Sequence, residues 1–192
     1  LKAIAACKGT QPILDKAVEA AAEGPALLAL EMVDNKRPEA EAIVLRQLET
    51  KPSSAMRQAY ARALLDNQRY TEATAQLQRI TVEDAEFADA WLMLGTLQAQ
   101  DGRLDAADTS LKRFLALAET QAASEQRSRA MAQAYLGLAQ VAEKRKDYAA
   151  AEGWLNRIDN AEELLSAQNR RASLLARQGK LDEARALIRA LP

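Results

Sequence analysis

One short pattern occurs five times along the chain and constrains its fold more than any other feature. In each copy an alanine is followed, four residues later, by an aliphatic residue, and in four copies an aromatic residue or leucine stands three residues before the alanine. Where two antiparallel helices approach to about 8–10 Å, a side chain larger than a methyl group would force them apart. The recurring alanine therefore predicts a series of closely packed helix hairpins. The alanines are Ala40, Ala73, Ala107, Ala151 and Ala184, and the aliphatic residues are Val44, Leu77, Leu111, Leu155 and Ile188.

The five copies define repeats of similar length. They begin near Ala21, Ser54, Ala88, Ala132 and Leu165, which gives spacings of 33, 34, 44 and 33 residues. A second column falls where the first helix of each hairpin should end, and it consists of Asn35, Gln68, Gly102, Lys146 and Gly179. Glycine and asparagine tolerate the left-handed conformation that ends many helices, so three of these five positions carry the expected residue type.

These columns predict one solenoid over residues 1–192 that belongs to a longer array. The repeats cover about 21–53, 54–87, 88–131, 132–164 and 165–192, and residues 1–20 are expected to form a preceding or capping helix. The longest spacing predicts two long helices that meet near residues 122–124, with Ser124 as the N-cap of the second helix.

With these residues in register, the sequence resembles the tetratricopeptide repeat (TPR) family, whose repeats carry W-x₂-L-G-x₂-Y followed by alanine, phenylalanine and proline. The matching residues are Trp91, Leu94, Gly95 and Ala107 in the third repeat, Tyr135, Leu138, Ala139, Tyr148 and Ala151 in the fourth, and Pro52 at the end of the first. The departures are Arg171 in place of the usual leucine, and Glu31 and Gln47 at normally apolar positions.

The resemblance implies an all-α fold: a right-handed superhelical solenoid of antiparallel helix hairpins with about five repeats. HEAT-type hairpins and a plain helical bundle are the alternative folds. HEAT units of about 40–47 residues fit only the 44-residue spacing.

Composition argues against several classes of function. The chain has no histidine and a single cysteine, Cys7, so it lacks the residues for a Ser-His-Asp or Cys-His nucleophile, a His-ligated metal site or an internal disulfide. Its 26 Lys and Arg balance 27 Asp and Glu, whereas nucleic-acid binding needs clustered positive charge. We therefore expect no catalytic residue, no metal, no cofactor and no nucleic-acid partner, and we interpret Cys7 as a small packing residue.

The sequence contains no run of about 18 apolar residues, so we expect no membrane-spanning segment. Frequent alanine, and more arginine than lysine, indicate a bacterial source. We accordingly expect a soluble bacterial protein of the cytoplasm or periplasm.

The TPR resemblance also implies a binding groove, lined by the first helices of successive hairpins, that receives an extended peptide or a partner helix. The family's groove positions correspond to Gln58, Arg62, Asp89, Leu92, Met93, Thr96, Gln100, Gln133, Leu136, Gln140, Lys144, Asn169, Arg170, Ser173 and Arg177. Amide side chains both donate and accept hydrogen bonds, which suits a peptide backbone. Arg170 and Arg177 lie two turns apart on one helix face and are suited to fork onto a ligand carboxylate.

Some TPR proteins clamp the acidic tails of chaperones with a fixed set of Lys, Asn and Arg residues. Of that set only Arg170 is present, and the other positions carry Leu92, Thr96, Gly137 and Ser166. We therefore do not expect tail clamping of this kind.

The sequence thus predicts a non-enzymatic protein–protein interaction scaffold that binds a peptide or helix in its groove. Two alternatives stay open: an accessory TPR domain of a larger enzyme, and self-association through the C-terminal hairpin. The second alternative depends on an apolar stripe formed by Leu187, Ile188 and Leu191. Because each repeat buries its apolar face only against its neighbours, this hairpin is expected to be the least stable or to be covered by another molecule.

Overall fold

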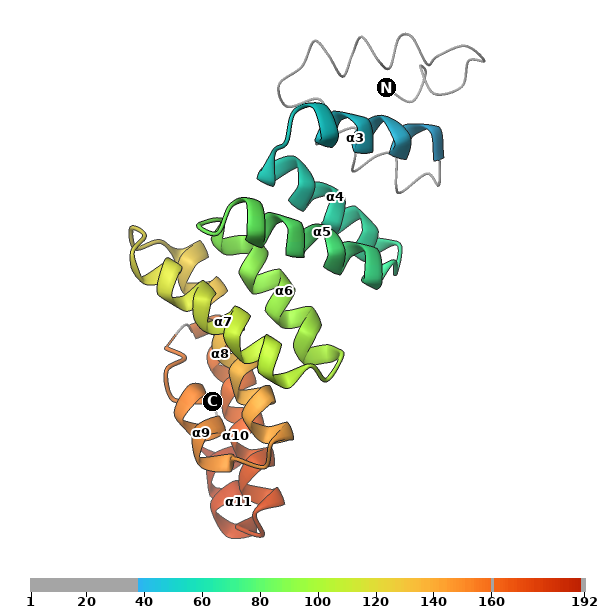
Figure 1. The fold of residues 1–192 in the computed structure, drawn as a ribbon. Helices are drawn as coiled ribbons and strands as arrows, with labels where there is room; N and C mark the ends of the chain where they lie inside the picture. The colour runs from blue at the N-terminus through green and yellow to red at the C-terminus, as the bar shows by residue number, and fades with distance from the viewer. Residues whose placement is uncertain (1–37, 160, 191–192) are drawn as a thin grey trace, which may run out of the picture. The chain divides into compact units, whose positions relative to one another are not determined.

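The computed structural model describes residues 38–159 and 161–190, and all the regular elements in these ranges are α-helices (Figure 1). The predicted helix over residues 1–20, Cys7, Glu31, Asn35 and Leu191 lie outside these ranges. The chain divides between Phe87 and Ala88 into two compact units, which are described in turn.

The first unit contains α3 (Pro38–Thr50), α4 (Ser54–Asp66) and α5 (Tyr70–Glu83). The helix α4 begins where the Ser53 side chain accepts a hydrogen bond from the backbone N–H of Met56, which satisfies one of the free donors of the first turn. Helices α4 and α5 form a hairpin around the fully buried Ala73 and Leu77.

A charged cluster connects α3, α4 and α5, the helices described in the first unit. The Tyr60 hydroxyl donates a short hydrogen bond to the Glu41 carboxylate, and the Arg69 guanidinium donates to the same carboxylate over 2.9 Å. Arg69 also pairs with Glu72 in the first turn of α5. The hydrogen bond from Arg69 lowers the pKa of Glu41, while burial and the contact with Glu41 raise the pKa of Tyr60. This cluster holds α3 against the α4–α5 hairpin.

The second unit contains three hairpins. They consist of α6 (Ala88–Gln100) with α7 (Leu104–Glu119), α8 (Glu125–Lys144) with α9 (Tyr148–Leu155), and α10 (Ala161–Arg177) with α11 (Leu181–Arg189). Successive hairpins also touch through α7 and α8 and through α9 and α10. The first helices are neighbours too, because α8 packs against both α6 and α10.

Four alanines of the predicted column are buried in the structure. Ala73, Ala107 and Ala151 have no exposed surface, and Ala184 is 5% exposed. In the second unit, Leu111 shows how close the helices come. A Cβ atom added to Gly95 would lie 2.7 Å from Leu111 Cγ, and one added to Gly137 would lie 2.8 Å from Leu111 Cδ1. Leu111 therefore fills the space that two glycines leave on α6 and α8.

The second predicted column marks the turns inside the hairpins. Gln68, Gly102, Lys146 and Gly179 all have positive φ, between 61° and 79°, so each ends its helix in the left-handed conformation. Two of these residues are not glycine and adopt a backbone conformation that is costly for an L-residue. The hairpin geometry thus imposes this conformation whatever the side chain.

The long third repeat has the predicted form. Helix α7 ends at Glu119, and α8 begins at Glu125 after Ser124, whose side chain accepts a hydrogen bond from the backbone N–H of Arg127. With 20 residues, α8 is longer than the 13-residue first helices α4 and α6. The additional residues extend α8 at its N-terminal end.

The C-terminal hairpin is less well covered than the others. Ile188 is 55% exposed, although the equivalent residues Leu77, Leu111 and Leu155 are buried. Leu181 is also 52% exposed. At the position where the family usually has leucine, this repeat carries Arg171. Its guanidinium donates to the amide oxygen of Gln168 over 3.3 Å and to the carboxylate of Glu152 over 3.5 Å.

Candidate peptide-binding face

In the first unit, α4 carries two of the predicted binding residues in different environments. Arg62 is exposed, whereas Gln58 is only 8% exposed. Gln58 occupies the same repeat position as Leu92 and Leu136, which are half-buried in the second unit. Its side chain belongs to the packed side of α4, and its contact with a ligand stays a prediction.

The second unit carries the other thirteen predicted residues on α6, α8 and α10, and we refer to this surface as the first-helix face. Eight of them are exposed: Asp89, Thr96, Gln100, Gln133, Lys144, Asn169, Ser173 and Arg177. Five are half-buried: Leu92, Met93, Leu136, Gln140 and Arg170. Because α8 packs against both α6 and α10, these residues share one continuous set of helices.

The apolar part of the first-helix face is formed by Leu92 on α6 and Leu136 on α8. Both pack against the core of the second unit while keeping part of their surface accessible. One turn beyond Leu92 lies the exposed Thr96, whose hydroxyl donates a 2.8 Å hydrogen bond to the backbone carbonyl of Leu92. This arrangement offers a partner apolar contact surface beside exposed polar side chains.

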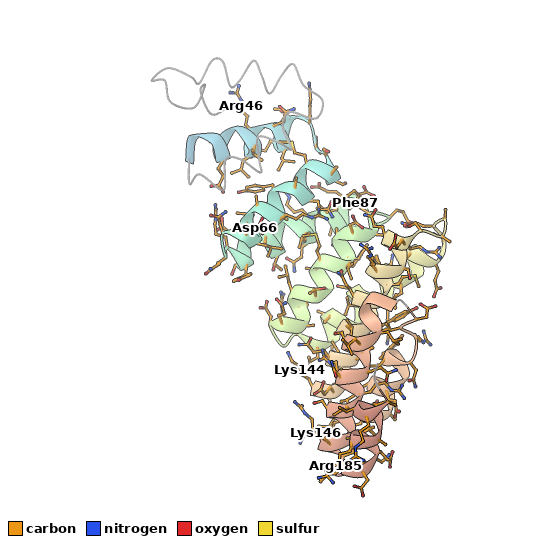
Figure 2. The ribbon with its side chains drawn as sticks, turned by 180° about the vertical axis from the view of Figure 1, so that it is seen from behind. Arg46, Asp66, Phe87, Lys144, Lys146 and Arg185 are labelled. Atoms are coloured by element: carbon orange, nitrogen blue, oxygen red, sulfur yellow. The ribbon has the colours of Figure 1, made fainter. Side chains whose placement is uncertain are left out.

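Lys144, at the C-terminal end of α8, forms a hydrogen bond with the neighbouring helix α6. Its Nζ donates a 2.6 Å hydrogen bond to the backbone carbonyl of Ala99, in the last turn of α6. Figure 2 labels Lys144, the last residue of α8, and Lys146 in the turn that follows. A cation at this place compensates the partial negative charge of the α6 C-terminus.

Glu143 forms the centre of a second link, toward α10. One carboxylate oxygen accepts from Arg177 Nη1 over 2.6 Å, and the other lies 3.3 Å from Arg170 Nη2. The Glu143 side chain is only 13% exposed, while that of Arg177 is 61% exposed. The two arginines do converge on a carboxylate, as their spacing suggested, but this carboxylate belongs to the protein itself.

Glu143 is the residue of this face that the sequence analysis did not single out. The signal was available in the repeat register. Glu143 lies 34 residues before Arg177, which is one TPR repeat length. Opposite charges one repeat apart on successive first helices are positioned to pair, whereas the sequence analysis considered the arginines only as ligand contacts.

Two further findings concern the described parts of the chain. Among residues 38–159 and 161–190, no group of three or more Asp, Glu or Cys side chains is arranged to hold a metal ion. In the same ranges, no helix has the length and apolar character needed to cross a membrane.

A family model described as "Tetratricopeptide repeat" matches the chain at residues 59–122 and 108–164. Together these matches extend over 59–164, which is more than half of the 192 residues. They include α5 to α9 entirely and most of α4. No curated protein sequence matches the chain.

Solved structures resemble the chain in fold. The crystal structure of MamA protein aligns with a TM-score of 0.69 and 19% identity, over 86% of this chain and 88% of that one. A putative kinesin light chain with nearly identical TPR-like repeats, from Podosopora anserina, gives 0.66 and 19% over 87% and 91%. A tetratricopeptide repeat protein from Parabacteroides merdae gives 0.64 and 18% over 97% and 71%. These similarities confirm the predicted all-α, TPR-like solenoid of helix hairpins.

Proposed function

The chain belongs to the tetratricopeptide repeat family, and from this premise we propose that it binds an extended peptide or a helix of a partner protein on its first-helix face. The fold is in general that of a protein-interaction scaffold, and TPR proteins are generally non-enzymatic. The proposal goes further, because it assigns the binding surface within the second unit.

The observation that carries this proposal is the mixed character of the first-helix face. Leu92 and Leu136 offer accessible apolar surface on adjacent helices, and Gln133 and Gln140 on α8 provide amide groups beside it. Apolar contacts supply affinity, while amides satisfy the backbone donors and acceptors of a bound segment. The Glu143 cluster and Lys144 already hold their charges in internal contacts, so the favoured partner segment is apolar and polar rather than strongly acidic.

A pair of matched threonines allows a sharp test. Thr96 on α6 and Thr109 on α7 are both exposed, and each donates its hydroxyl to the carbonyl four residues earlier, over 2.8 Å and 2.9 Å. Thr96→Arg places a long cation on the first-helix face, whereas Thr109→Arg places it on a second helix. Each variant loses an equivalent hydrogen bond from a side chain to the backbone, so their effects on stability should be similar.

The experiment compares the proteins that the wild-type chain and the two variants retain from a lysate of the native organism, identified by quantitative mass spectrometry. We expect a partner that is retained by the wild type and by Thr109→Arg but depleted at least tenfold with Thr96→Arg. A partner that both variants retain equally would place the binding surface elsewhere.

Self-association through the C-terminal hairpin is a second candidate function, favoured by the exposed Leu181 and Ile188. Light scattering over a concentration series should then show a mass that increases with concentration, and Ile188→Lys should abolish the increase. A constant monomer mass at all concentrations would exclude it.

A further inference from the structure

The N-terminal extension of α8 forms one wall of a pocket in the second unit. The pocket has a volume of about 200 Å³, and the residues that line it include Arg127 and Met131 from the first two turns of α8, Tyr135 one turn further, and Arg157, Ile158 and Asp159 from the segment after α9. Without the long third repeat, α8 would not provide Arg127. The insertion that distinguishes this repeat thus contributes directly to a cavity.

The pocket is amphipathic. Ile158 and Tyr135 form its apolar part, and both are packed side chains with little accessible surface, 5% and 9% exposed. Arg127, Arg157 and Asp159 supply two positive charges and one negative charge. The charge balance of the lining favours a ligand group with a single negative charge.

The contacts that hold both arginines are with groups that carry no formal charge. The Arg127 guanidinium donates through Nη1 to the backbone carbonyls of Ala118, over 3.5 Å, and of Gln121, over a shorter distance. The Arg157 guanidinium lies over the Trp154 ring, with Cζ 4.6 Å from the ring centroid. Among the described residues, neither guanidinium forms an ion pair with a carboxylate.

The aromatic residues preorganise the pocket. The rings of Trp154 and Tyr135 stack with centroids 6.1 Å apart and an angle of 18° between their planes. Arg157 packs on the outer member of this stack, and Tyr135 forms part of the pocket lining. The cation–π contact limits the rotamers of Arg157, so a ligand loses less entropy in ordering it.

The size of the pocket restricts its occupant. Binding sites for small molecules typically enclose about 300–1,000 Å³. A volume of about 200 Å³ suits a single amino-acid side chain better. Arginine binds a carboxylate through two parallel hydrogen bonds, and Asp159 at the same pocket penalises a doubly charged phosphate more than a singly charged carboxylate.

From these features we infer that the pocket between the α8 extension and the segment after α9 is a second protein-binding site, which receives an acidic side chain of a partner segment with an apolar residue next to it. The acidic side chain pairs with Arg157, and the apolar neighbour contacts Met131 and Tyr135. This site is independent of the first-helix face, since none of its lining residues belongs to that face.

The test uses three capped dipeptides and the NMR signal of the indole N–H of Trp154, whose ring lies under the Arg157 guanidinium. N-acetyl-Glu-Leu-amide should shift this signal in a saturable way, and N-acetyl-Gln-Leu-amide should bind at least about tenfold more weakly, because charge-assisted hydrogen bonds are the stronger ones. N-acetyl-phosphoserine-Leu-amide should bind more weakly than the Glu peptide. Equal binding of the Gln peptide, or tighter binding of the phosphoserine peptide, would overturn the inference.

Three variants separate recognition from folding. Arg157→Gln should weaken binding of the Glu peptide about tenfold, and Arg46→Gln, which removes an exposed arginine of α3 (Figure 2), should leave it unchanged. Asp159→Asn removes the acidic group from the pocket without disturbing Arg157, and it should strengthen binding about twofold or more. A weaker affinity of Asp159→Asn for the Glu peptide would contradict recognition of a negatively charged side chain at this pocket, and the inference would fail even if Arg157→Gln were poorly folded.

Discussion

At the residue scale, the fold depends on places where only a very small side chain fits. The fully buried Leu111 touches α6 at Gly95 and α8 at Gly137, and Ala107 lies fully buried one turn before it. Protein interiors are packed as densely as organic crystals, so a single added methyl group at such a contact is felt. The small residues of the repeat pattern are therefore requirements of packing between helices.

We expect Gly95→Ala to destabilise the second unit by about 1–3 kcal/mol, because the new Cβ would lie 2.7 Å from Leu111 Cγ and 3.1 Å from the Leu111 backbone nitrogen. Gly153→Ala on α9 is the matched control, since nothing lies within 4 Å of a Cβ atom at that position. This control should stabilise the protein by about 0.5–1 kcal/mol, because alanine favours a helix interior over glycine. Urea denaturation followed by circular dichroism measures both changes, and equal effects of the two substitutions would contradict the packing argument.

At the scale of helices and turns, each hairpin reverses through one residue in the left-handed conformation. Lys146 has φ 62° and Gly102 has φ 77°, so equivalent turns use different residues for the same backbone shape. An L-residue pays a conformational cost there that glycine avoids. The turn geometry is thus set by the two helices that it joins.

Lys146→Gly should therefore stabilise the protein by about 1 kcal/mol, and Gly102→Ala should destabilise it by a similar amount. Neither substitution removes a packed side chain, because Lys146 and Gly102 are exposed. Thermal and urea denaturation of the two single variants and of their combination would show opposite shifts that nearly cancel. A loss of stability in Lys146→Gly would contradict this account.

The charged cluster of the first unit makes the docking of α3 dependent on pH. The pKa of Glu41 is lowered in the folded state, chiefly by the hydrogen bond from Arg69. A carboxyl group with a lowered folded-state pKa stabilises the protein above its ordinary pKa of about 4.3, and this contribution is lost as the pH falls through the lowered value.

We expect the wild-type protein to lose more stability between pH 5 and pH 3 than Glu41→Gln does, in urea denaturation at a series of pH values. Glu49→Gln, at an exposed position of the same helix, serves as the control and should follow the wild type. If the Glu41→Gln protein lost as much stability on acidification as the wild type, the cluster would not be the cause.

At the scale of the whole molecule, the protection of backbone amides against hydrogen exchange should differ along the second unit. A TPR repeat buries its apolar side chains against the next hairpin, so stability is close to a sum of neighbour contacts. Leu111, in the first of these hairpins, is fully buried, and Ile188, at the equivalent position of the last hairpin, is 55% exposed. The last hairpin of the unit accordingly has fewer stabilising contacts than the first.

Native-state hydrogen exchange should therefore be faster for the amides of α11 than for those of α7 in a dilute sample. The physical reason is that local opening of α11 exposes little additional apolar surface. A concentrated sample provides the second measurement, since protection of α11 that rises with concentration would indicate self-association. If α11 were as well protected as α7 in the dilute monomer, the neighbour-contact account would be wrong.

The sequence by itself determined the helix hairpins, the turns inside them and the family. The alanine column and the turn column could be recognised from spacing alone, because they reflect contacts within one hairpin, whose two helices are close in sequence. The N-cap at Ser124 could be recognised for the same reason. The right-handed superhelix, the single five-repeat solenoid and the bacterial source stay predictions.

Only the tertiary structure decided which residues far apart in the sequence meet and which polar residues are buried. Glu143 forms ion pairs with Arg170 and Arg177, and Arg127 and Arg157 line the same pocket. Gln58 lies on the packed side of α4. Residues in such contacts are separated by 27 to 34 positions, and their pairing depends on the rotation and offset of one helix against another. Many side chains together set this offset through packing, so no local pattern in the sequence encodes it.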